Sequence, residues 1–489
     1  MTAAHPPARP PLQRRPFPHL VFGGAASAGV ALSALIAWGH PILAARWGLL
    51  WRIVLWAAAW FIAVAAALQL PRRTAVALIL GAAVALRVAA LAGAPTTSDD
   101  LYRYAWDGRV QLAGLDPYTS APAAPQLAGL HERWLWPDAA GCAALHRRAG
   151  CTRINRPSSR TIYPPVAEAW FSVVYRLGGI GARYKAWQIA GLLTDMATVG
   201  LLVVGLRRWG RDTRWVALYA LSPFAVVEIV NNAHVDGLAI AFAVAALVVG
   251  AEGSSVCPSY HWTRSEAGRD IAVGLLLGAA ALVKLYPALL LVAVVGVGNT
   301  RAARSLGRAA LAAAGLAVVA YLPHVWVAGW RVVGFLPGYL KEEHYDHGGR
   351  FLLAGTLGLP GPATAALAAL GLLGAVGWVL WRRPPFVRGV AVLLAALFLT
   401  ATPVQPWYAC SLLAVATLAS WPWWAAITAA GYPYFFAVIL DDPHTVGLGR
   451  ACYAAALAVL VIVHQIDRRR AASTPTVAPN GATMADVSR

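Results

Sequence analysis

Long apolar segments, separated by short polar or basic turns, follow one another along most of the chain. A helix that crosses a membrane needs about 20 predominantly apolar residues, and about 14 segments of this sequence approach that length. The segments 271–283 and 286–298 are too short for full crossings, so we interpret them as half-helices of a span broken at Lys284 to Pro287. The predicted segments are 20–38, 47–70, 74–94, 186–206, 214–231, 234–251, 271–283, 286–298, 304–325, 355–381, 386–402, 408–421, 423–440 and 448–466. The pattern therefore predicts an all-α polytopic membrane protein with about 12–14 transmembrane helices.

Composition agrees with this class and excludes a soluble protein. Of the 489 residues, 59% are hydrophobic and only 12% are charged, whereas a soluble domain carries about 25% charged residues. The net charge of +19 would suggest a nucleic-acid partner in a soluble protein. Here the arginines are concentrated in turns between apolar segments, which is the positive-inside pattern of a membrane protein, so we expect no nucleic-acid partner. These runs are Arg72-Arg73, Arg207 to Arg214, Arg301 to Arg308, Arg382-Arg383 and Arg468 to Arg470.

The basic runs also predict the topology in a cytoplasmic membrane. With residues 1–19 as a cytoplasmic tail, every run and the C-terminal tail 471–489 lie inside, and 20–470 forms the membrane domain. The composition of 471–489 is typical of a disordered segment. Three stretches are then extracytoplasmic, 95–185, 326–350 and 403–408, and within the first we expect residues 162–177 to form a helix in the membrane interface.

Five cysteines exclude a fully paired disulfide framework. Cys142 and Cys151 lie close together in the first extracytoplasmic stretch. The sequence leaves open whether they form a disulfide bond or remain two free thiols.

The strongest polar motif extends from Thr97 to Arg109. Ser98 is a suitable N-cap for a helix whose first turn holds Asp99 and Asp100, and Gly114 is expected to end this helix. Two adjacent carboxylates just beyond a membrane span make a good site for a general base. The alternative is that they only complement the helix dipole. On the same helix Asp99, Arg103 and Asp107 share one face.

Two further polar positions interrupt the apolar pattern. The motif from Asn231 to Asp236 is placed at the outer end of one span and the start of the next, where its side chains would hold sugar hydroxyls or a cation, or simply form a polar hairpin tip. Lys284 interrupts a long apolar run, which costs at least ~2.5 kcal/mol near the middle of a membrane, so we expect an anionic partner unless the side chain reaches the interface. Arg87 lies inside the third predicted span, and its partner is not predictable from the sequence.

Motifs of nucleotide-binding and metalloprotease sites are absent from the sequence. The polar motifs face a compartment that we expect to contain no nucleotide sugars. An activated substrate there would have to arrive on a lipid.

The acidic motif resembles that of bacterial polyprenol-phosphate-mannose-dependent mannosyltransferases and related class C (GT-C) glycosyltransferases. The later motifs from Asn231 to Asp236 and from Lys284 to Pro287 are similar to those of the bacterial families. The residues that carry the first resemblance are Asp99-Asp100, Tyr102-Arg103-Tyr104, Trp106-Asp107-Gly108, Gly114 and Pro117-Tyr118, and Tyr163-Pro164-Pro165 is similar to the Tyr-x-Pro of eukaryotic members.

This resemblance implies a GT-C-like helical bundle with juxtamembrane helices in the large first extracytoplasmic loop. It also implies a polyprenyl-phosphate sugar donor, with mannose as the expected sugar, and a lipid-linked or polysaccharide acceptor of the cell envelope. The sequence departs from the pattern at Asp116, where Asn or Ser is usual, and in its short C-terminal tail. Neither departure identifies the acceptor.

The expected roles in an inverting transfer follow from the resemblance and the residue types. Asp100 matches the catalytic acid and would act as the base, while Asp99 would orient Arg103 or hold a divalent cation, so the need for a metal stays open. The donor phosphate would be bound by Lys284, Arg103, Tyr163 and Tyr286. The sugar or acceptor would be bound by Asn231, His234, Asp236, Asp107, His344 and Gln405.

Two other functions remain open from the sequence. In a secondary transporter, Lys284, His234 and Asp236 would form the substrate pathway. In an oligosaccharide ligase or polymerase of similar architecture, the enzyme would move a glycan instead of one sugar.

Overall fold

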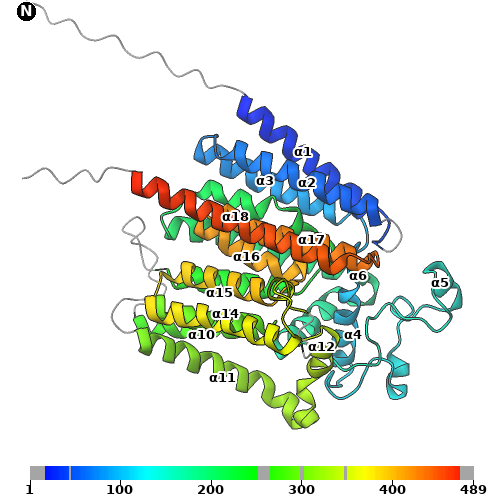
Figure 1. Cartoon of the computed structure of the whole chain (residues 1–489). Coiled ribbons are helices and arrows are strands. Elements are labelled where there is room, and N and C mark those ends of the chain that lie inside the picture. Colours follow the sequence, from blue (N-terminus) through cyan, green and yellow to red (C-terminus); the bar gives the residue numbers. More distant parts are fainter. Residues whose placement is uncertain (1–16, 43–45, 252–264, 298–301, 346–349, 474–489) are drawn as a thin grey trace, which may run out of the picture.

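The computed structural model describes residues 17–42, 46–251, 265–297, 302–345 and 350–473, and this part of the chain is helical without strands. Most helices lie roughly side by side along one direction (Figure 1). The helices of at least ten residues are α1 (Phe17–Ala37), α2 (Arg46–Ala67), α3 (Arg72–Ala90), α4 (Asp100–Leu112), α6 (Pro165–Arg208), α9 (Asp236–Val249), α10 (Glu266–Ala281), α11 (Ala302–Ala328), α14 (Gly361–Arg382), α15 (Phe386–Thr400), α16 (Pro406–Ala419), α17 (Ala425–Ile439) and α18 (Thr445–Ser473), with the 3₁₀ segment η4 (Tyr286–Gly296).

Short helices connect these elements. They are α5 (Ala139–Ala144), α7 (Ala217–Ala220), α8 (Pro223–Ala225), α12 (Leu336–Glu342), α13 (Leu352–Gly355), the π-helix η3 (Val226–Asn231), and the 3₁₀ turns η1 (Pro125–Leu130), η2 (Thr213–Val216), η5 (Gly329–Val333) and η6 (Pro422–Trp424).

The predicted all-α membrane fold is confirmed, but fewer helices than expected are long enough for a full crossing. In the described part of the chain, seven helices are long and apolar enough to span a membrane, and eight if the bent pair Thr213–Ala220 and Pro223–Asn231 counts as one span. Several other predicted segments are shorter apolar helices, such as α15 and α16. The estimate of 12–14 spans was based on the lengths of the apolar stretches. The helices within several of these stretches are shorter than the stretches themselves, because prolines and turns end them.

Two predicted breaks are present. The segment expected in the interface is helical from Pro165, and non-helical dihedral angles at Gly179 and Arg183 separate it from the candidate span Gly181–Arg208 within α6. The second break is at Lys284, which lies between the end of α10 and the start of η4. Both breaks bring polar backbone or charge to the ends of apolar segments.

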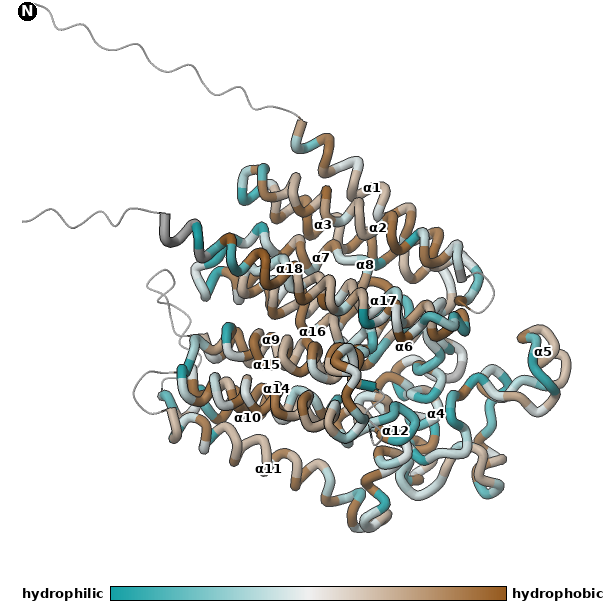
Figure 2. Tube along the Cα trace, in the orientation of Figure 1, coloured by the Kyte–Doolittle hydropathy of each residue, from teal (hydrophilic) through white to brown (hydrophobic). Residues whose placement is uncertain are grey.

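The basic turns and the large polar loop lie at opposite ends of the helical bundle. Arg214 donates to the carbonyl oxygens of Leu68 and Leu70, so the runs Arg72-Arg73 and Arg207 to Arg214 share one end, and Arg208 donates to the carbonyl oxygen of Val248 near the end of α9. The first described residues of α1 and the end of α18 also lie toward this side, whereas α4, α5 and α12 lie at the opposite side (Figure 1). Figure 2 shows hydrophilic chain gathered around α4, α5 and α12 and brown apolar stretches along the long helices.

Arg87, the buried arginine of the third predicted span, has a partner that no sequence pattern predicts. Arg87 is fully buried, and its Nε donates to Oδ2 of Asp195 at 2.5 Å. Its Nη1 donates to the carbonyl oxygens of Ala83 and Ala220, and Tyr219 donates to the other carboxylate oxygen of Asp195. This network ties α3, α6 and α7 together inside the bundle.

The large loop between α3 and α6 is a packed structure. The ring of Tyr104 on α4 stacks on Phe171 on α6, with centroids 4.5 Å apart. A Cβ atom on Gly108 would approach the Phe171 carbonyl oxygen to 2.6 Å, so only glycine permits this close helix approach. Cys142 and Cys151 form a disulfide bond, which answers the question that the sequence left open.

Candidate active site

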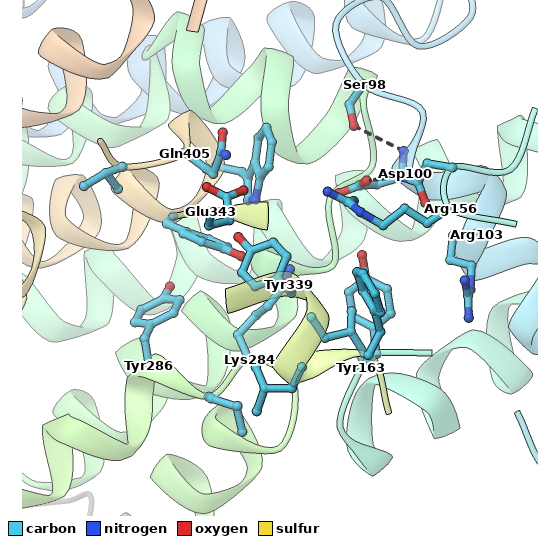
Figure 3. Close-up of a pocket in the computed structure, with 18 of the residues that line it drawn as sticks. Ser98, Asp100, Arg103, Arg156, Tyr163, Lys284, Tyr286, Tyr339, Glu343 and Gln405 are labelled. Atoms are coloured by element: carbon cyan, nitrogen blue, oxygen red, sulfur yellow. Dashed lines mark hydrogen bonds between the residues drawn. The ribbon is translucent and has the colours of Figure 1, made fainter. Parts of the chain in front are cut away.

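A cavity of about 490 Å³ opens at the polar end of the bundle. Its walls come from the start of α4, the loop before α6, the break between α10 and η4, the region of α12, the end of α15 with the loop before α16, and α17. The wall combines charged side chains with apolar ones such as Leu336, Phe398 and Phe435. Figure 3 shows Asp100 on one side of this cavity and Lys284 with Tyr339 on another. The fold thus brings together residues from six distant parts of the sequence.

Asp100 is positioned by the N-terminus of α4. The helix begins at Asp100 with Asp99 as its N-cap residue, so the expected cap at Ser98 is displaced by one residue. Ser98 still contributes, because its Oγ accepts a hydrogen bond from the backbone N–H of Asp100 at 3.2 Å. Gly114, with φ of +77°, follows the end of the helix as expected. The helix start therefore directs the Asp100 carboxylate into the cavity.

Three groups stabilise the ionised form of Asp100. Asn155 donates to its Oδ1 at 2.6 Å, and His234 Nδ1 lies 3.5 Å from its Oδ2. Burial alone would raise the pKa of Asp100, but the nearby His234 imidazole, the charge of Lys284 and the Asn155 hydrogen bond outweigh it and lower the pKa to about 2. Asp100 is thus a carboxylate throughout the physiological range and still has 18% of its side chain exposed to the cavity.

Asp99 also lines the cavity, but it does not hold Arg103 as expected. Its N-cap position places it outside the helix, with φ of −111° and ψ of 9°, so the helical spacing to Arg103 does not apply. Asn155 donates to its Oδ1 at 3.2 Å. Burial and the neighbouring charge of Asp100 raise the pKa of Asp99. The pKa of Asp99 is therefore raised and that of Asp100 is lowered, so the two adjacent carboxyl groups differ in how readily they ionise.

Arg103 forms an ion pair with Asp107. Its Nε donates to both carboxylate oxygens of Asp107 at 3.0 Å, and its Nη1 donates to the Ser159 carbonyl oxygen at 2.9 Å. Arg103 borders the cavity, whereas Asp107 is buried behind it. Arg103 therefore keeps a place beside the expected phosphate, but Asp107 is an arginine partner and does not reach the cavity as a sugar ligand.

Lys284 reaches the cavity from the broken span. Its Nζ lies 3.4 Å from Oδ2 of the buried Asp236 and over the rings of Tyr163 and Tyr408, 5.0 and 5.1 Å from their centroids. Lys284 is thus a cation with an anionic partner, as the apolar context predicts. Its Nζ is thus held at the cavity wall between two aromatic faces and one carboxylate.

The remaining residues expected to bind the donor or the sugar divide into two groups. Tyr163, Tyr286 and Gln405 line the cavity. Asn231 and His344 do not line it, so their expected contacts with the sugar or acceptor stay predictions. Asn231 is buried and holds the loop before α4 by donating to the carbonyl oxygens of Ala90 and Ala94, while His344 is exposed outside the cavity.

His234 and Asp236 are buried directly behind the cavity wall. Neither lines the cavity, so they contact its polar residues from behind and do not reach a sugar there. His234 faces Asp100, and Asp236 faces Lys284. The motif from Asn231 to Asp236 thus supports the site, which differs from the direct binding role expected from its position.

Several residues that line the cavity were not predicted from the sequence. Among them are Asn155, Arg156, Tyr339, Glu343 and Arg350. Arg156 pairs with Glu342 at 2.7 Å, while Arg350 pairs with Glu343 and donates to the Pro403 carbonyl oxygen. The one sequence signal concerned Arg156, which belongs to the many basic residues of the stretch 95–185, and the other four residues carried none.

The described residues of the site form no ready metal position. Among the described residues, no group of three or more histidine, cysteine, aspartate or glutamate side chains is arranged to hold a metal ion. The divalent cation considered for Asp99 therefore has no further protein ligand of these types assembled around it in the described structure.

Comparison with known proteins places this site in a family. The profile of glycosyltransferase family 87 matches residues 161–406, which is half of the chain and contains Lys284, the motif from Asn231 to Asp236, and Gln405. A solved structure, the oligosaccharyltransferase of Archaeoglobus fulgidus tethered with an acceptor peptide, is similar at 12% sequence identity and a TM-score of 0.35. That alignment covers 90% of this chain and 55% of the archaeal chain, so this chain spans about half of that protein's length. No curated protein sequence matches.

The family match, together with the membrane-spanning helices, confirms the expected membrane glycosyltransferase and favours an enzyme over a transporter. On this match the chain belongs to glycosyltransferase family 87.

Proposed function

We propose that this glycosyltransferase transfers a single sugar, with mannose as the first candidate, from a polyprenyl-phosphate donor to a lipid-linked or cell-envelope glycan acceptor. The observation that carries the proposal is the shared cavity of an ionised aspartate and a buried lysine, Asp100 and Lys284. A base and a cation on the walls of one cavity suit an acceptor hydroxyl and a departing phosphate.

The lining of the cavity supports a lipid-linked donor. Apolar side chains of the α12 region, α15 and α17 form part of the wall beside Lys284, among them Leu336, Phe398 and Phe435. A polyprenyl chain would lie against such surface while its phosphate meets the cationic side chains. A nucleotide sugar would instead require polar contacts for its base and ribose.

The proposed reaction is one inverting displacement. Asp100 accepts the proton of the acceptor hydroxyl, and that oxygen attacks the anomeric carbon. The bond between this carbon and the phosphate oxygen breaks, and polyprenyl phosphate leaves with the electron pair. A separate general acid is unnecessary, because a phosphate is a good leaving group without protonation.

Positive charge at the leaving phosphate would come from Lys284, with Arg156 and Arg103 at the cavity wall. The hydroxyl groups of Tyr163 and Tyr286 would add hydrogen bonds. We place the reaction on the extracytoplasmic side, because the cavity lies opposite the basic turns and because the same loop carries the disulfide bond Cys142–Cys151.

The test uses purified protein in detergent or liposomes with a panel of donors. The panel contains polyprenyl-phosphate mannose, glucose and arabinose, together with the corresponding nucleotide sugars, and a membrane lipid extract supplies the acceptor. We expect release of polyprenyl phosphate and transfer of one sugar only with lipid-linked donors, and no transfer by Asp100→Asn. Parallel reactions with a chelator examine the need for a metal.

Transfer from nucleotide sugars alone would overturn the proposed donor class. Transfer of an assembled glycan would instead favour the oligosaccharide ligase or polymerase alternative. Substantial activity of Asp100→Asn would overturn the assignment of the base.

A further inference from the structure

We infer that Glu228 and His234 form a buried relay with Asp100, in which His234 is a positioning residue that bridges two carboxylates and holds the proposed base in its reactive orientation. This inference rests on the proposed role of Asp100. It assigns no substrate contact to His234 or Glu228, because neither lines the cavity.

The geometry of the three side chains supports a bridge. Nδ1 of His234 lies 3.5 Å from Oδ2 of Asp100, and Nε2 of the same ring lies 3.5 Å from Oε2 of Glu228. The side chains of His234 and Glu228 are 0% and 1% exposed. An imidazole with a carboxylate at each nitrogen is best satisfied as an imidazolium, because both nitrogens then carry a proton to donate.

The far carboxylate is itself held in place. Tyr432 on α17 donates to Oε1 of Glu228 at 2.6 Å, and Asn232 donates to Oε2 at 3.1 Å. Glu228 lies on the π-helix η3, inside a segment that the sequence shows as otherwise apolar. A buried carboxylate in such a segment requires a specific partner, and its side chain points to His234.

The local backbone directs His234 toward Asp100. The π-helix ends at Asn231, and Ala233 has φ of +57°, a conformation that costs a residue with a side chain of order 1 kcal/mol or more. The backbone N–H of His234 donates to the carbonyl oxygen of Glu228 at 3.1 Å. The imidazole then stacks on Trp407 of α16, with centroids 4.1 Å apart and planes inclined by 16°. The ring is therefore fixed by both its backbone and an aromatic neighbour.

Other ionisable groups near His234 do not replace the two carboxylates as ring partners. Asp236 on α9 acts on His234 through its charge but pairs with Lys284. Lys284 acts on Asp100 through its charge. Tyr104 on α4 borders the same small internal space as His234. The net environment of the ring is anionic, which favours the protonated form.

The relay explains how a buried carboxylate remains ionised. Burial alone would lower the pKa of His234, but the two carboxylates of Asp100 and Glu228, each 3.5 Å from a ring nitrogen, outweigh it and raise the pKa to about 9. Glu228 balances the charge of the imidazolium, so Asp100 keeps its own negative charge for the acceptor proton. Without Glu228 the ring would lose its proton at a lower pH and would no longer hold Asp100 from behind.

The test is the pH profile of kcat/KM for three variants. Wild-type activity should be flat between about pH 5 and pH 8, because the relevant pKa values lie below and above this range. In His234→Gln the pKa of Asp100 rises, so activity at pH 5 relative to pH 7.5 should fall several-fold. In Glu228→Gln the pKa of His234 falls, so the alkaline decline should begin at least one pH unit lower.

A matched control is His324→Gln. His324 is also paired with an aspartate, at 2.7 Å from Asp116, but this pair does not line the cavity. Its profile should keep the wild-type shape. Unchanged profiles in both His234→Gln and Glu228→Gln would overturn the relay, whereas an inactive wild-type protein would count against the proposed function instead.

A second measurement does not depend on activity. The chain contains 12 histidines, and solid-state NMR of ¹⁵N-histidine-labelled protein in lipid, compared with His234→Gln, isolates the signals of this ring. We expect both ring nitrogens to be protonated at pH 7.5, and one of them to lose its proton in Glu228→Gln. A neutral ring in the wild-type protein at pH 7.5 would overturn the inference whatever the substrate is.

Discussion

Nζ of Lys284 lies 3.4 Å from Oδ2 of Asp236, and both side chains are largely withdrawn from solvent, with exposures of 12% and 0%. The pair joins the break after α10 to the first residue of α9. It therefore holds the cation at the cavity wall and also balances a carboxylate that has no access to water. Removal of the lysine would disturb both binding and stability.

Lys284→Met should abolish transfer and also lower stability. The loss of one member of a buried ion pair costs about 3–5 kcal/mol, because the other charge is left without a partner. The double variant Lys284→Met/Asp236→Asn removes both charges and should recover most of the thermal stability without recovering activity. The measurements are the unfolding temperature in detergent and the rate of polyprenyl phosphate release.

This pair of variants separates two roles of Lys284. If the double variant regained activity together with stability, the lysine would be a structural residue only. If the single variant kept its stability, the ion pair would contribute little to the fold.

The sequence predicted the general architecture and several of the site residues, because both depend on local patterns. Apolar stretches, the break at Lys284 and the helix start at Asp99-Asp100 are visible without any tertiary information. The contacts of Arg87, which is paired with Asp195 on a distant helix, are not visible. Pairing between helices depends on their rotation and depth, and no spacing rule along one segment contains that information.

The motif from Asn231 to Asp236 shows the same limit within the site. Its polar residues were predicted to be functional, but their side chains turn behind the cavity because η3 is a π-helix and Ala233 has a positive φ. A prediction that assumes regular α-helical spacing therefore places these side chains on the wrong face. Asn155 and Arg350 were missed for a different reason, since each enters the cavity from an irregular loop.

Neutralisation of the two adjacent aspartates should have unequal effects. Asp100→Asn removes the proposed base and should lower kcat by about 10²–10⁴-fold. Asp99→Asn removes a like charge beside Asp100, which favours the ionised base, so it should retain at least about a tenth of the activity. The measurement is kcat at saturating donor, with expression and unfolding temperature as controls. The reverse order of effects would move the catalytic role to Asp99.

Arg156 should contribute to binding of the donor phosphate. It lines the cavity, and its side chain is 43% exposed while it pairs with Glu342, so it remains accessible to an anionic ligand. Arg156→Ala should raise KM for the donor about 10-fold, in keeping with the loss of one charged hydrogen bond. The matched control is Arg133→Ala, because Arg133 lies in the same loop region with 91% exposure and does not line the cavity.

An equal effect of the two arginine substitutions would indicate a general influence of loop charge. An unchanged KM in Arg156→Ala would exclude this side chain from the phosphate site. Titration with salt adds a further check, since a direct contact in a partly enclosed cavity is screened less than attraction to an exposed arginine.

The side of the membrane that carries the cavity can be determined with single cysteines. In a background without native cysteines, Ala149→Cys introduces a thiol in the loop of the disulfide, and Arg73→Cys introduces one in the basic first turn of α3; both native residues are exposed. In intact cells a membrane-impermeant maleimide should label the first variant, and should label the second only after permeabilisation. This result is expected because the basic turns face the cytoplasm and a disulfide persists on the oxidising side. The opposite pattern would place Asp100 in the cytoplasm, where nucleotide sugars are available, and would remove the reason for a lipid-linked donor.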